Sequence, residues 1–145
     1  MFKYTPHILL AMALIFVQVF LLDNIDLGSS ISIWIRPMIF PLIVILLQME
    51  WRTVWALLIG TLVGLTMDLS LGGAGLYTAT LLPLAMIRRW MLYLTTRRSI
   101  EHGDQTSVLL RLSRGQLMGY TVTMLAIHHT LFFTMETLSL AHPLR

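Results

Sequence analysis

The sequence predicts an all-α fold, a polytopic bundle of membrane helices that forms a single domain over residues 1–145. Of its 145 residues, 57% are hydrophobic and only 12% are charged, about half of the roughly 25% that is usual in soluble domains. The mean hydropathy is +0.78. Five hydrophobic segments approach the roughly 20 apolar residues that a membrane span needs. These segments run over 8–22, 32–49, 52–71, 75–95 and 116–140.

The first two segments differ in how regular a helix they predict. Segment 8–22 is followed by no cleavage site of small residues, so we expect an uncleaved membrane helix that ends at the polar loop 23–30. Segment 32–49 carries Pro37 and Pro41 in its first turns, where proline is tolerated or produces a kink. We expect a second membrane helix there.

The next two segments flank a glycine cluster. Segment 52–71 is free of charge from Thr53 to Met67 and then contains Asp68 near its end. The run Gly72-Gly73-Ala74-Gly75 leads into segment 75–95, which has Pro83 in its middle. Because glycine permits sharp turns, we expect a tight connection between two membrane helices here.

The fifth segment and the arginines set the expected topology. Segment 116–140 carries His128, His129 and Glu136. Six arginines gather before it, at the end of the fourth segment and in the loop 96–115: Arg88, Arg89, Arg97, Arg98, Arg111 and Arg114. The positive-inside rule makes this loop and the N-terminus cytoplasmic. Five spans then leave the C-terminus outside, and a sixth span would return it to the inside.

The arginine-rich loop has two interpretations. Its second half mixes apolar and basic residues at helical spacing, as an interfacial helix on anionic lipid would. The alternative is a solvated basic loop that only fixes topology. In either case we interpret the net charge of +3 as membrane topology, and we expect no nucleic-acid partner.

Gly60, Gly64 and Asp68 fall on one face of the third segment, at i, i+4 and i+8. The two glycines form a Gly-x-x-x-Gly motif, which permits close approach of another helix. Asp68 has three interpretations: a structural carboxylate that caps the glycine turn or pairs within the bundle, a partner or ligand contact, or a proton relay. A carboxylate in a membrane segment is costly unless it is paired, neutral or hydrated.

The sequence gives no positive indication of an enzyme. Ser70 lacks the Gly-x-Ser-x-Gly setting of a nucleophile, and the glycine cluster 72–75 lacks dinucleotide-binding spacing. His129 and Glu136 lie seven residues apart, which is no known metal spacing, and we expect neutral histidines bonded to a neighbouring helix. We expect no cofactor and no metal.

The stretch from Leu57 to Ser70, followed by Gly72-Gly73-Ala74-Gly75-Leu76-Tyr77, resembles the rod shape-determining MreD family. That family carries a glycine-rich helix, an aspartate, and then a Gly-Leu step into the next helix. Tyr77 stands where histidine is commoner. The positions that match the motif are Gly64, Asp68, Gly72, Gly75 and Leu76.

The resemblance implies a non-enzymatic protein of the bacterial inner membrane, with a fold similar to the S-components of energy-coupling-factor transporters. It implies binding to the scaffold protein MreC, in one assembly with MreB, RodA and penicillin-binding protein 2. We expect helix packing against the partner through these residues: Gly60, Gly64, Asp68, Gly72, Gly75, Leu76 and Tyr77. The alternative is a small-molecule-binding S-component-like subunit, whose pocket would be lined by Asp68, Tyr77, His129 and Glu136.

Overall fold

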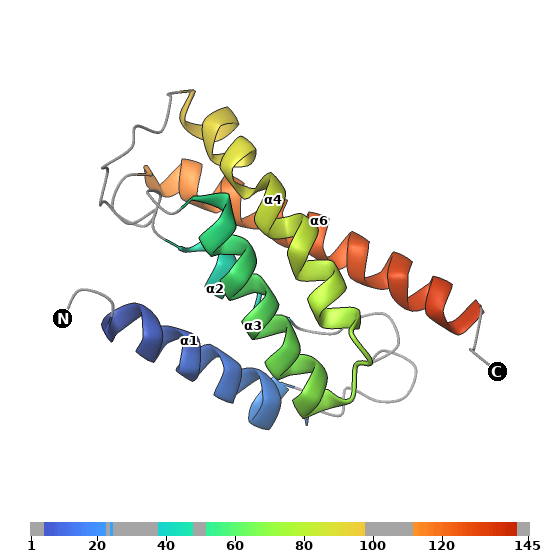
Figure 1. Ribbon diagram of the computed structural model, residues 1–145. Helices are drawn as coiled ribbons and strands as arrows, with labels where there is room; N and C mark the ends of the chain where they lie inside the picture. The colour runs from blue at the N-terminus through green and yellow to red at the C-terminus, as the bar shows by residue number, and fades with distance from the viewer. Residues whose placement is uncertain (1–4, 23, 25–37, 48–51, 98–111, 142–145) are drawn as a thin grey trace.

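A computed structural model describes residues 5–22, 24, 38–47, 52–97 and 112–141 (Figure 1), and every regular element among them is a helix. The elements are α1 (Thr5–Val17), the π-helix η1 (Gln18–Leu22), α2 (Leu42–Ile45), α3 (Thr53–Leu71), α4 (Leu76–Thr96) and α6 (Arg114–Ala141). The predicted all-α class is confirmed.

Three long helices form the body of the bundle. α3 and α4 are joined by a tight turn and pack against each other along their length, and α4 also packs against α6 (Figure 1). The beginning of α3, the end of α4 and the beginning of α6 therefore share one end of the molecule. α1 contacts α2, and η1 contacts α3.

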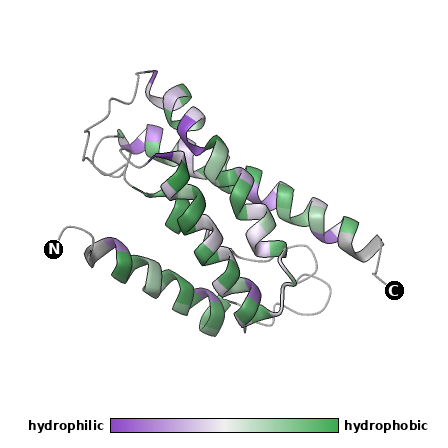
Figure 2. Cartoon of the chain, in the orientation of Figure 1, coloured by the Kyte–Doolittle hydropathy of each residue, from purple (hydrophilic) through white to green (hydrophobic). Residues whose placement is uncertain are grey.

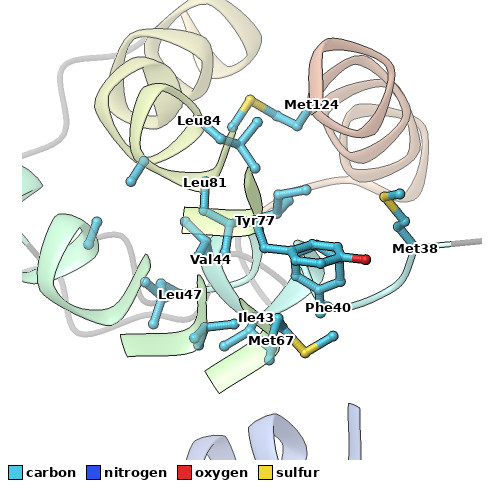
Figure 3. Packing of buried hydrophobic residues seen from close by; sticks show 14 of the residues in the cluster. Met38, Phe40, Ile43, Val44, Leu47, Met67, Tyr77, Leu81, Leu84 and Met124 are labelled. Atoms are coloured by element: carbon cyan, nitrogen blue, oxygen red, sulfur yellow. The ribbon is translucent and has the colours of Figure 1, made fainter. Parts of the chain in front are cut away.

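The core lies where α2, α3, α4 and α6 converge (Figure 3). Phe40 and Val44 come from the short segment around α2 and are fully buried. Met67, Leu81 and Met124 reach the same core from the three long helices. Segment 38–47 is thus surrounded by the rest of the chain.

A capping box begins α6. The backbone N–H of Gln116 donates to the Ser113 hydroxyl at 3.3 Å, and the Gln116 side-chain oxygen accepts the Ser113 N–H at 3.2 Å. Reciprocal bonds of this kind satisfy N–H groups that a helix start otherwise leaves without partners. The Gln116 amide also donates to the Thr95 carbonyl at 3.4 Å, which links the start of α6 to the end of α4.

The prediction of a second helix over 32–49 is wrong for the residues of that segment that the structure describes. Of residues 38–47 only Leu42–Ile45 is helical. Pro41 directly precedes this single turn, and proline has no N–H to offer a helix that continues through it. The other four predicted helices are confirmed to within a few residues of their predicted ends. Residues 98–111 of the predicted loop 96–115 lie outside the described part.

One described helix, α3, is both long and apolar enough to cross a membrane. His7–Leu22 forms a shorter apolar helix. At about 1.5 Å per residue, the 19 residues of α3 extend about 29 Å, close to the roughly 30 Å of a bilayer core. Hydrophobic residues make up much of every long helix (Figure 2), and Leu62 and Leu69 are 67% and 86% exposed.

Candidate functional site

Asp68 caps the start of α4. Gly75 precedes that helix and has no side chain with which to cap it. Asp68 of α3 supplies the acceptors instead: Oδ1 accepts the Tyr77 N–H at 3.0 Å, and Oδ2 accepts the Thr78 N–H at 3.0 Å and the Thr78 hydroxyl at 2.6 Å. A carboxylate at a helix start satisfies free N–H groups and complements the helix dipole.

These hydrogen bonds agree with the first interpretation of Asp68, a structural carboxylate at the glycine turn. The carboxylate is 8% exposed, and backbone and hydroxyl donors surround it. Hydrogen bonds to the charged form offset the cost of burial. The expectation of a structural carboxylate at the glycine turn is confirmed.

Gly64 lets α3 and α4 approach closely beside this cap. A Cβ at Gly64 would lie 2.5 Å from the Thr78 Cα and 2.9 Å from the Thr78 nitrogen, distances that no side chain can occupy. At Gly60 the nearest atom, the Ala85 Cβ, would lie at an ordinary 3.6 Å. Only the second glycine of the Gly-x-x-x-Gly motif is therefore required by the packing.

The turn itself needs glycine for two different reasons. Gly72 and Gly75 have φ values of +68° and +91°, which side-chain-bearing residues rarely adopt. Gly73 needs the space, because a Cβ there would lie 2.5 Å from the Tyr77 ring and 2.6 Å from the Asp68 carboxylate. Each of these glycines is thus explained by the α3–α4 connection.

The helix that approaches Gly60 and Gly64 is the chain's own α4, and this corrects the partner contact predicted for these glycines. Both are buried, and their face of α3 is occupied within the fold. Gly72 and Gly75 are exposed, and Leu76 packs partly buried against the core.

Tyr77 belongs to a buried aromatic cluster rather than to a surface. Its ring lies 5.6 Å from Phe40, edge to face, and 5.4 Å from Phe132. His128 is fully buried and meets Phe40 edge to face at 5.3 Å. Aromatic pairs at these distances favour such arrangements. The cluster joins α4 and α6 to the segment that precedes α2.

The residues of the predicted small-molecule pocket have different surroundings. His129 donates from Nδ1 to the Leu125 carbonyl of its own helix at 2.8 Å, so the bond to a neighbouring helix predicted for it is wrong. Asp68 and Tyr77 are joined by the hydrogen bond from the Tyr77 backbone N–H to the Asp68 carboxylate. Within the described residues there is no group of three or more His, Asp or Glu side chains that could hold a metal ion.

A second polar centre holds the broken segment 38–47. The Gln18 side-chain oxygen accepts the Ile39 N–H at 2.8 Å, and the Tyr120 hydroxyl donates to the Ile45 carbonyl at 3.1 Å. Arg88 donates to the Leu47 carbonyl and lies beside the Tyr120 hydroxyl. Buried backbone groups outside a regular helix need hydrogen-bond partners of this kind.

Arg88 is 2% exposed, so its predicted role in lipid or cytoplasmic contact is wrong. It belongs to the buried face of α4, and its guanidinium serves the backbone of segment 38–47. Arg89, Arg97 and Arg114 are exposed, as that prediction requires. Arg98 and Arg111 lie outside the described residues.

The sequence prediction missed Gln18, Tyr120 and Phe40. Gln18 had a usable signal, since it is the one strongly polar residue within the apolar run 8–22. Tyr120 and Phe40 had none, because an aromatic residue in an apolar segment fits a core or a lipid-facing position equally well. Comparisons of the chain with models of protein families, with curated proteins and with solved structures found no match.

Proposed function

We propose that this chain is a non-enzymatic, multi-pass subunit of the bacterial inner membrane, with a cytoplasmic N-terminus. In this proposal it binds the scaffold protein MreC of the cell-elongation machinery. RodA, penicillin-binding protein 2 and MreB join the same assembly. The proposal starts from the resemblance to the MreD family.

The α3–α4 turn is the observation that supports the resemblance. Gly64 permits the close approach, Asp68 caps α4, and Gly72 and Gly75 make the turn. Leu76 begins α4 against the core. The five positions that match the family motif therefore act together as one structural unit, as members of a family motif should.

The outer face of α3 offers the surface for MreC. Five exposed apolar residues follow one another there at steps of three and four, and we call them the α3 stripe: Trp55, Leu58, Leu62, Leu65 and Leu69. This spacing averages 3.5 residues, the repeat with which one helix packs along another. We propose that the membrane helix of MreC packs on the α3 stripe.

Recovery of MreC with the tagged chain from detergent-solubilised membranes tests this function. We expect MreC to be recovered with the wild-type chain, and a Leu58→Ala, Leu62→Ala, Leu65→Ala variant to lose most of it. The matched control, Met118→Ala with Val122→Ala, changes exposed residues of α6 and should recover MreC fully. Absence of MreC with the wild-type chain would overturn the proposal. Equal recovery with both variants would overturn the assignment to the α3 stripe.

A second candidate function is a small-molecule-binding subunit similar to an S-component. The interrupted segment 38–47 favours it, since broken helices with polar partners form solute sites in transporters. Mass spectrometry of the purified chain for a bound vitamin, together with ligand-dependent melting, separates the two candidates. A retained vitamin and a raised Tm support the second candidate, and the absence of both contradicts it.

A further inference from the structure

Charge is separated along the bundle. All five described arginines lie toward the end where α3 begins, α4 ends and α6 begins: Arg52, Arg88, Arg89, Arg97 and Arg114. The two described carboxylates, Asp68 and Glu136, lie toward the opposite ends of α3 and α6. Figure 2 shows polar residues at the end of α4 and the beginning of α6. Among the described residues, the charged side chains at this end are therefore all arginines.

Four of these arginines face outward, and we call them the arginine end: Arg52, Arg89, Arg97 and Arg114. Arg88 is buried within the fold and therefore does not belong to the arginine end. The hydrogen bond from the Gln116 amide to the Thr95 carbonyl holds the two helix ends together. Arg97 lies two residues after Thr95, and Arg114 lies two residues before Gln116. The hydrogen bond therefore keeps both arginines at the same junction.

Aromatic side chains are exposed beside these arginines. Trp90 and Tyr93 of α4, between Arg89 and Arg97, are 62% and 52% exposed. On α3, Trp55 follows Arg52 by three residues and is 57% exposed. Tryptophan and tyrosine favour the headgroup level of a bilayer, and arginine places its apolar stem in lipid and its guanidinium at the phosphates.

We propose that the arginine end binds the headgroups of anionic phospholipids in the cytoplasmic leaflet. This inference rests on the membrane location in the proposed function. It adds a preference for lipid charge, with the guanidinium groups as the phosphate-binding groups. The exposed aromatic residues among the arginines favour lipid over nucleic acid, because their rings and the apolar helix surface need a bilayer to cover them.

Tryptophan quenching in reconstituted bilayers tests the inference. A full-length variant with Trp34→Phe, Trp51→Phe and Trp55→Phe keeps Trp90 as the single reporter. Brominated phosphatidylglycerol and brominated phosphatidylcholine then compete for the lipid positions around it. We expect the anionic lipid to be favoured at least about threefold, since each exposed cation near the surface attracts anionic lipid, and 0.5 M salt to reduce the preference.

Matched variants identify the groups responsible. Arg89→Gln, Arg97→Gln and Arg114→Gln together should abolish the preference, and the same three changes to lysine should keep it. A reporter at the opposite end is provided by Phe133→Trp with all native tryptophans replaced by phenylalanine. This reporter should show no preference for the anionic lipid.

Three outcomes contradict the inference in different ways. Equal quenching of Trp90 by both lipids overturns the anionic preference and leaves the membrane location standing. Quenching by neither lipid, with a chain that stays in solution without detergent, overturns the proposed membrane function as well. A glutamine variant that keeps the preference overturns the assignment to the arginine end.

Discussion

Thr78 donates both its backbone N–H and its hydroxyl to the Asp68 carboxylate, at 3.0 and 2.6 Å, across the junction of α3 and α4. The cap of α4 thus comes from the preceding helix rather than from the residue before α4. A cap supplied in this way joins two helices as well as ending one. The Asp68 side chain therefore links α3 to α4 directly.

Asp68→Ala should lower the free energy of unfolding by about 1–3 kcal/mol, because three donors lose their acceptor. Unfolding in detergent, followed by far-UV circular dichroism, measures it. Ser70→Ala changes an exposed residue of the same helix and should stay within about 0.5 kcal/mol of wild type. Equal effects of the two substitutions would contradict the capping role.

The two glycines of α3 should respond differently to alanine. Gly64→Ala places a Cβ against the Thr78 backbone and should cost about 1–3 kcal/mol of stability. Gly60→Ala meets only ordinary contacts and should be neutral or stabilise the helix by up to about 1 kcal/mol. The same unfolding measurement checks both. A Gly60→Ala variant less stable than Gly64→Ala would show that the close approach lies elsewhere.

Arg88→Met should destabilise the chain by about 1–3 kcal/mol, because the buried Leu47 carbonyl loses its charged donor. Arg89→Met, one residue away and exposed, should change stability by less than about 0.5 kcal/mol. The difference between the two melting temperatures is the readout. An Arg88→Met variant as stable as wild type would indicate that the guanidinium does not hold segment 38–47.

Tyr120→Phe removes the second hydrogen bond to that segment, together with the contact between the Tyr120 hydroxyl and Arg88. Loss of the bond to the Ile45 carbonyl should cost about 1 kcal/mol, with packing of the ring unchanged. Tyr93→Phe is the control, since Tyr93 is 52% exposed. Chemical unfolding of the two variants side by side checks this prediction, and a larger loss at Tyr93 would oppose it.

Long apolar runs and a glycine cluster were enough to predict α1, α3, α4 and α6. They could not predict the break at segment 38–47, because its stability depends on Gln18, Arg88 and Tyr120 from distant parts of the chain. The prediction for 32–49 considered only local tolerance of proline in a first turn.

Arg88 shows why the positive-inside rule does not separate neighbouring arginines. The rule counts charges near span ends and disregards the helix face on which each lies. Helical spacing places Arg88 with Leu81, Leu84 and Leu92, all buried, while Arg89 points outward. The Gly-x-x-x-Gly motif has a similar limit, since it predicts a close approach without indicating whether the second helix belongs to the same chain.

α4 occupies one face of α3, and under the proposed function the α3 stripe is left for MreC. Photo-crosslinking in living cells tests it with two adjacent positions, exposed Leu62 and buried Val63. A photoreactive residue at position 62 should crosslink to MreC, and one at position 63 should crosslink only within the chain. Crosslinking to lipid alone at position 62, or to MreC equally at both positions, would contradict binding of MreC to the α3 stripe.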